Sequence, residues 1–98
     1  MQQADIMDKA SIMIVEDDPI NLAMITKILT EAKFDCHGVA DGQKCLTDVL
    51  LVKPTLILMD IRMPVLDGIE TCRRLKLDSA TRNIPVIFVT GDTDDDSL

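Results

Sequence analysis

Three short runs of apolar residues predict the central strands of the fold. They cover residues 12–15, 56–59 and 86–89, and none of them alternates between apolar and polar positions. Runs of about four apolar residues without alternation are typical of strands buried on both faces. Segments with helical spacing separate the runs, and this alternation indicates βαβ units with a parallel sheet. The predicted fold class is therefore α/β.

Three helices are expected, and each has a start signal. The first begins at Asp18 and Pro19, because Asp is a favoured N-cap and Pro a favoured first helical residue. The second begins after Asp41 and ends before Pro54, and the third begins after Asp67 with the spacing of a capping box. Residues 35–40 form a weak strand candidate that suits a sheet edge.

The apolar positions predict which helix faces are buried. In the first helix Met24 and Ile28 widen the apolar stripe beyond one contact face, so this helix is expected to have two neighbours. The expected buried stripe of the third helix consists of Ile69, Cys72 and Leu75.

Composition excludes several classes of protein. The chain has 98 residues, enough for one domain, and its 47% apolar and 28% charged residues are ordinary for a globular fold. A net charge of −7 argues against direct nucleic-acid binding. No segment approaches the roughly 20 apolar residues of a membrane span, and residues 1–11 lack the apolar run of a signal peptide. Cys36, Cys45 and Cys72 show no CxxC spacing, so we expect reduced thiols and a cytoplasmic protein.

Polar residues follow each apolar run, and they are the candidates for chemistry. Glu16 and Asp17 follow the first run, Asp60 the second and Thr90 the third. Neighbouring parallel strands would bring these residues to one edge of the sheet, where clustered carboxylates repel each other unless a cation such as Mg²⁺ lies among them. Asp60 is then the best-placed nucleophile for phosphoryl transfer, with Thr90 near the phosphoryl oxygens. Asp18 is assigned to helix capping.

Three stretches together resemble the receiver domain of two-component response regulators. They are residues 14–19 (Ile-Val-Glu-Asp-Asp-Pro), residues 58–64 (Leu-Met-Asp-Ile-Arg-Met-Pro) with Asp67 and Gly68 following, and residues 86–91 (Val-Ile-Phe-Val-Thr-Gly). The resemblance implies a flavodoxin-like, doubly wound parallel sheet of order 2-1-3-4-5. It also implies a signalling module rather than a metabolic enzyme.

The resemblance assigns roles to individual residues. Asp60 would accept a phosphoryl group from a histidine of a sensor kinase or phosphotransfer protein, and Thr90 would be the switch hydroxyl. The ligands of Mg²⁺ would be Asp17, Asp60, Glu16 through water, and the backbone carbonyl of Arg62.

The chain departs from the family pattern at its end. No lysine follows Lys76, although the family has one after its fifth strand. Helix 4, strand 5 and helix 5 of the family are expected to be missing, which leaves an incomplete receiver domain at 11–98 after an extension at 1–10. Met24, Ile28 and the strand at 86–89 would then be uncovered, so we expect self-association, for example as a homodimer.

One other function remains open at this point, and two enzyme classes are disfavoured. A receiver-like interaction module that is never phosphorylated would also fit, since the family lysine is absent. A phosphatase of the haloacid dehalogenase type needs a second Asp two residues after its nucleophile, where this chain has Arg62. The four glycines match neither GxGxxG nor a P-loop, which argues against a nucleotide-binding enzyme.

Overall fold

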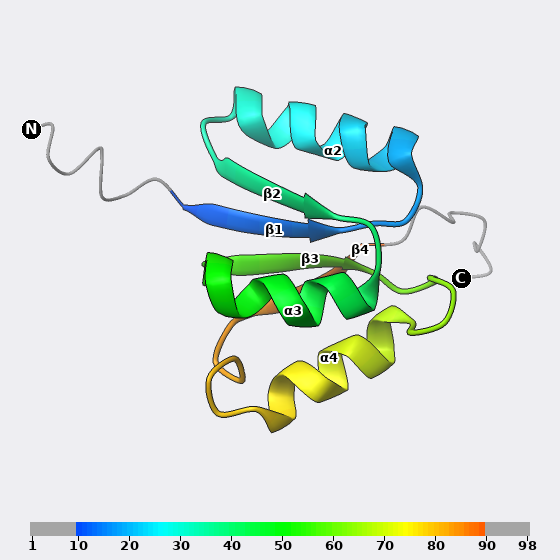
Figure 1. Cartoon of the computed structure of the whole chain (residues 1–98). Helices are drawn as coiled ribbons and strands as arrows, with labels where there is room; N and C mark the ends of the chain where they lie inside the picture. Colours follow the sequence, from blue (N-terminus) through cyan, green and yellow to red (C-terminus); the bar gives the residue numbers. More distant parts are fainter. Residues whose placement is uncertain (1–9, 90–98) are drawn as a thin grey trace, which may run out of the picture.

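A computed structural model describes residues 10–89 of the chain. Strands and helices alternate along these residues, as the apolar runs predict (Figure 1). In chain order the elements are β1 (Ser11–Val15), α2 (Pro19–Glu31), β2 (Asp35–Val39), α3 (Gly42–Val52), β3 (Leu56–Asp60), α4 (Gly68–Leu77) and β4 (Val86–Val89). None of the described helices is long and apolar enough to cross a membrane.

The four strands form one parallel sheet of order β2-β1-β3-β4. The chain first moves outward from β1 to β2 and then crosses back to β3, so the strand order reverses next to β1. This reversal defines a doubly wound sheet, in which ligands bind at the carboxyl ends of the strands beside the switch point. The predicted fold class, the strand order and the edge position of β2 are confirmed.

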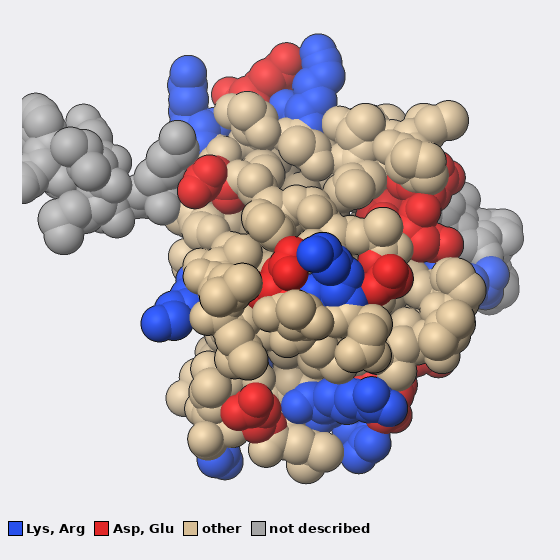
Figure 2. All heavy atoms as spheres, in the orientation of Figure 1, with Lys and Arg blue, Asp and Glu red and all other residues tan. Residues whose placement is uncertain are grey.

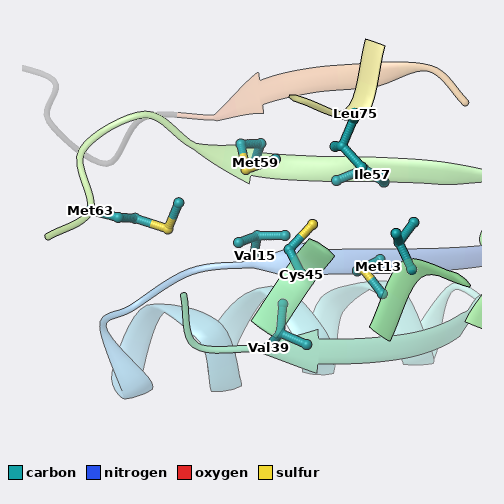
Figure 3. Close-up of a cluster of buried hydrophobic side chains, with 9 residues drawn as sticks. Met13, Val15, Val39, Cys45, Ile57, Met59, Met63 and Leu75 are labelled. Atoms are coloured by element: carbon teal, nitrogen blue, oxygen red, sulfur yellow. The ribbon is translucent and has the colours of Figure 1, made fainter. Parts of the chain in front are cut away.

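Helices α3 and α4 cover one face of the sheet, and the main core lies beneath them (Figure 1). Side chains from the sheet, from α3 and α4, and from the loop after β3 point toward one another there (Figure 3). The cluster consists of Met13, Val15, Val39, Cys45, Val49, Ile57, Met59, Met63 and Leu75. It contains no aromatic residue, so the packing depends on flexible and branched aliphatic side chains.

Helix α2 lies on the other face of the sheet (Figure 1). Beneath it Ile12 and Ile14 of β1 are buried, and Leu22 fits against Gly38 of β2, where an added Cβ would lie 3.0 Å from the Leu22 side chain. No residue of α2 itself is buried, since only one side of the helix contacts the sheet. The second neighbour expected for this helix is not found among the described residues.

The predicted helix starts are confirmed by their caps. Asp18 accepts a hydrogen bond from the N–H of Ile20 at 2.9 Å, Asp41 from that of Lys44 at 2.7 Å, and Asp67 from that of Glu70 at 2.8 Å. These contacts satisfy backbone donors that have no partner within the helix.

The predicted buried stripe of α4 is wrong in part. Leu75 is buried, but Ile69 is 54% exposed and Cys72 is only half-buried. Thr71 lies in the core instead, because its hydroxyl donates to the carbonyl of Asp67 at 2.8 Å and needs no other partner. A helix-periodicity argument that counts only apolar residues overlooks a threonine satisfied in this way.

Candidate functional site

The strand register brings three carboxylates together at one edge of the sheet. Val15 at the end of β1 is paired with Met59 of β3, so the next residues, Glu16 and Asp60, lie beside each other. Glu16, Asp17 and Asp60 each offer one carboxylate oxygen, and these three oxygens lie within 4.8 Å of one another. This convergence is what the sequence pattern predicted.

Two of the three carboxylates are buried and held by backbone N–H groups. Glu16 is 6% exposed and Asp60 is 9% exposed, whereas Asp17 is exposed. The N–H of Asp18 donates to Oε2 of Glu16 at 3.1 Å, and the N–H of Arg62 donates to Oδ1 of Asp60 at 3.3 Å. Both side chains are therefore oriented by the loops that follow their strands.

Burial and mutual repulsion change the acidity of this cluster. Burial raises the pKa of Glu16, and the nearby charges of Asp60 and Asp17 raise it further against the hydrogen bond from Asp18. Burial is also the largest cause that raises the pKa of Asp60, while the hydrogen bond from Arg62 opposes it. Removing negative charge from water next to other negative charges is unfavourable, so a cation at this place would be stabilising.

The donor set suits a hard divalent cation. Carboxylate and carbonyl oxygens are the ligands that Mg²⁺ prefers, and its octahedral shell at about 2.0–2.1 Å commonly keeps several waters. The cluster offers carboxylate oxygens only, without a histidine or cysteine that would favour a softer metal. Glu16, Asp17 and Asp60 therefore fit Mg²⁺ by charge, ligand type and spacing.

Other acidic residues at the same edge serve the fold rather than the cluster. Asp18, Asp41 and Asp67 each cap a helix. They still add negative charge around the three clustered carboxylates, and Figure 2 shows acidic atoms gathered on the side of the molecule where the strands end. The N-cap role predicted for Asp18 is confirmed by its hydrogen bond to Ile20.

Gly68 closes the loop that follows Asp60. Its N–H donates to the carbonyl of Ile61 at 2.9 Å, and an added Cβ would lie only 2.2 Å from the backbone oxygen of Asp60. Only glycine permits this approach without moving the chain. The start of α4 therefore packs directly against the backbone that carries the central carboxylate, a role that the sequence pattern alone did not assign to Gly68.

The same loop contains a strained turn that sequence reasoning missed. Val65 has φ +67°, and the N–H of Leu66 donates to the carbonyl of Pro64 at 2.7 Å. A hydrogen bond between residues two apart around a positive φ defines the rare, strained form of γ-turn. The Val65 side chain is fully exposed and borders an open hollow of about 430 Å³ between this loop and the start of α3.

Thr90 and His37 are not part of the described carboxylate cluster. Thr90 is outside the described residues, although Val89 before it is paired with Asp60 in the sheet. His37 lies on β2, where its Nε2 is 3.1 Å from Oδ2 of Asp48, so it tethers the edge strand to α3 rather than joining the acidic cluster.

Comparison with known families identifies one match that covers nearly the whole chain. The family described as "Response regulator receiver domain" matches residues 12–98. The DNA-binding response regulator MtrA of Mycolicibacterium smegmatis is 37% identical over 83 residues, which are 85% of this chain and 35% of MtrA. Response regulator PleD of Caulobacter vibrioides is 36% identical over 82 residues, or 84% of this chain and 18% of PleD. The chain thus spans about a third or less of the length of these relatives.

Solved structures show the same fold. The N-terminal domain of a response regulator receiver protein from Methanoculleus marisnigri JR1 has a TM-score of 0.82 at 32% identity, covering 90% of this chain and 73% of that one. The receiver domain of sensor histidine kinase PA1611 from Pseudomonas aeruginosa PAO1 has a TM-score of 0.80 at 31% identity, covering 90% and 74%. That structure is described with a magnesium ion coordinated in its active-site cleft.

Proposed function

This chain belongs to the response regulator receiver domain family, and from that premise we propose that Asp60 accepts a phosphoryl group in a Mg²⁺-dependent step. The observation that carries the proposal is the cluster of Glu16, Asp17 and Asp60, in which a buried carboxylate lies next to an oxygen-only cation site. Receiver domains are signalling modules, so the product of this reaction is a state of the protein rather than a released metabolite.

The proposed ligands are Asp17 and Asp60 directly, Glu16 through water, and the backbone carbonyl of Arg62. When bound, Mg²⁺ supplies neutralisation of the charge on the incoming phosphoryl group. The similar protein PA1611, described with magnesium in its cleft, supports this assignment.

The chemical step is an in-line displacement on phosphorus. A carboxylate oxygen of Asp60 forms a bond to phosphorus while the bond between phosphorus and a histidine nitrogen of the donor breaks. The imidazole leaves with the electron pair and takes up a proton from solvent. The N–H of Arg62 holds Oδ1 of Asp60 at 3.3 Å, which fixes the orientation of the nucleophile before the donor arrives. We assign the switch hydroxyl, which would donate to the phosphoryl group, to Thr90.

The proposed donor is a sensor histidine kinase or a histidine phosphotransfer protein. Receiver domains of this family act with such partners, and one structural relative is itself the receiver domain of a sensor histidine kinase. We propose a cytoplasmic location, since Cys36, Cys45 and Cys72 are all free thiols, as expected in a reducing compartment.

Intact-mass spectrometry tests the proposal directly. The chain would be incubated with acetyl phosphate, with and without Mg²⁺, beside Asp60→Asn and the matched control Asp41→Asn. Asp41 lies at the same edge but caps α3, so its replacement should leave phosphorylation intact. One phosphoryl group added in the presence of Mg²⁺, absent from Asp60→Asn and present in Asp41→Asn, is the expected result.

A failure to take up phosphate would favour the alternative function, an interaction module that binds partners without phosphorylation. The same spectra distinguish a third case. If Asp60→Asn is still phosphorylated, another residue is the acceptor and the assignment to Asp60 is wrong.

A further inference from the structure

Helices α3 and α4 start side by side at the carboxyl ends of the strands (Figure 1). At this place Gly42, the first residue of α3, faces Thr71 in the first turn of α4. A Cβ added at Gly42 would lie 2.2 Å from Oγ1 of Thr71 and 2.9 Å from the backbone oxygen of Leu66. Any side chain at position 42 would therefore push the two helix starts apart, and glycine permits the close approach.

The Thr71 side chain is fixed in this contact. It is fully buried, and its hydroxyl donates to the carbonyl of Asp67 at 2.8 Å. The branched Cβ and this hydrogen bond together restrict the side chain to one rotamer. Oγ1 therefore stays at the start of α3 and cannot turn away to make room.

The first turn of α4 is held from a second side by the strand that carries Asp60. A Cβ added at Gly68 would lie 2.2 Å from the backbone oxygen of Asp60, and the N–H of Gly68 donates to the carbonyl of Ile61 at 2.9 Å. The turn thus lies in a clamp between Gly42 and the backbone of Asp60. Protein interiors are dense and transmit displacements, so a shift forced at Gly42 should reach Asp60 or the loop at 61–67.

The loop at 61–67 connects the clamp to the acidic cluster. Near its start, the N–H of Arg62 donates to Oδ1 of Asp60 at 3.3 Å. Near its end, Leu66 is buried with its backbone oxygen close to Gly42. Both parts of the loop depend on where the first turn of α4 lies. A misplacement of about 1 Å in a reacting group can lower a rate by about 100-fold, so this dependence matters for the chemistry.

We propose that Gly42 and Thr71 are positioning residues for phosphoryl uptake. Neither belongs to the acidic cluster. They set how closely α3 and α4 approach, and through the loop at 61–67 they hold Oδ1 of Asp60 and the carbonyl of Arg62 in place. This inference rests on the proposed function of Asp60 and adds two residues outside the carboxylates to it.

Four variants test the clamp. Gly42→Ala introduces the clash, Thr71→Ala removes Oγ1, and the double variant leaves the new Cβ only the 2.9 Å approach to Leu66. The matched control is Gly38→Ala on β2, whose Cβ would lie 3.0 Å from the Leu22 side chain and far from the loop at 61–67 in the sheet. For each, urea titration gives stability, isothermal titration calorimetry gives Mg²⁺ affinity, and intact-mass spectrometry gives the rate of phosphoryl uptake from acetyl phosphate.

Among folded variants, Gly42→Ala should lower both the Mg²⁺ affinity and the uptake rate by about fivefold or more. The double variant should exceed Gly42→Ala by about twofold or more in both, because contacting residues do not act additively. Gly38→Ala should change both by less than about twofold even if its stability falls. If Gly42→Ala does not fold, Thr71→Val replaces it, since it puts a methyl group where Oγ1 faces Gly42, and Thr71→Ser, which keeps Oγ1, is its control.

Three results overturn the proposal: a folded Gly42→Ala, or Thr71→Val in its place, that matches the wild type in Mg²⁺ affinity and uptake rate; a double variant no better than Gly42→Ala; or a control that loses as much as the variant it is compared with. A wild type that binds Mg²⁺ but takes up no phosphoryl group refutes the proposed function instead. The Mg²⁺ affinities of the variants then still decide whether the clamp positions the cluster.

Discussion

Replacing Val65 by glycine should stabilise the folded protein, although it removes an apolar side chain. Val65 holds φ at +67° in the γ-turn between Pro64 and Leu66. A β-branched residue is disfavoured in this region because its Cβ crowds the neighbouring carbonyl oxygen. The side chain is fully exposed, so it makes no packing contact whose loss would offset the relief.

The size of the effect follows from two opposing terms. An L residue with positive φ costs roughly 1–2 kcal/mol, and glycine removes this cost. Glycine also gives the unfolded chain more freedom, which lowers stability by about 0.4–1 kcal/mol. The free energy of unfolding should therefore rise by about 0.5–1 kcal/mol, or roughly 2–8 °C in Tm for a domain of this length. Val65→Asn should give a similar gain, because asparagine tolerates positive φ without the entropy cost of glycine.

Urea unfolding of the wild type, Val65→Gly and Val65→Asn measures these differences. The control is Leu51→Gly, another exposed apolar residue, which lies in α3 and should lose about 0.5–1 kcal/mol on the same change. Both positions lose an exposed apolar side chain, so opposite signs of the change in the free energy of unfolding would indicate backbone strain at Val65 rather than an effect of hydrophobicity. If Val65→Gly is no more stable than the wild type while Leu51→Gly is destabilised as stated, the strain argument is wrong.

Three other results are expected. Gly68→Ala should lower the free energy of unfolding by about 1–3 kcal/mol in urea titrations and slow phosphoryl uptake, because the added Cβ would lie 2.2 Å from the backbone oxygen of Asp60. Unchanged stability would contradict the packing argument. Mg²⁺ should raise Tm more at pH 7 than at pH 5, because protons compete with the ion for Glu16 and Asp60, whose pKa values are raised. Without the ion, these two carboxyls should stabilise the folded state increasingly as pH falls through their raised pKa values. A Mg²⁺ effect that is equal at both pH values would count against these ligands. The hydrogen bond from His37 lowers the pKa of Asp48. The difference in Tm between the wild type and Asp48→Asn should therefore be present at pH 6 and shrink as pH falls through that lowered pKa. A Tm difference that does not depend on pH would show that the His37–Asp48 pair does not cause it.

Most of the fold could be predicted because its signals are local and repeated. Strands β1, β3 and β4 are short apolar runs, and each described helix starts after an aspartate whose side chain caps the backbone. Strand order requires more than local signals, and the predicted order came from the family resemblance. The error in α4 arose because Thr71 is buried with its hydroxyl satisfied, whereas Ile69 next to the site is exposed.

The acidic cluster could be predicted because parallel strands bring their carboxyl ends to one edge. Once β1 and β3 are neighbours, the residues after Val15 and Met59 must lie together, whatever the helices do. The same register places Val89, the last described residue of β4, beside Asp60.

The remaining features could not be predicted because they depend on how one loop returns to the sheet. The sequence around Val65 does not indicate a positive φ, since valine is among the residues least suited to it. The turn lies in the short loop between Asp60 and Gly68, whose end is packed against the backbone of Asp60. The same loop thus combines a close backbone contact at Asp60 with a strained backbone at the exposed Val65. The two positions should respond in opposite directions: Val65→Gly should raise the free energy of unfolding, and Gly68→Ala should lower it.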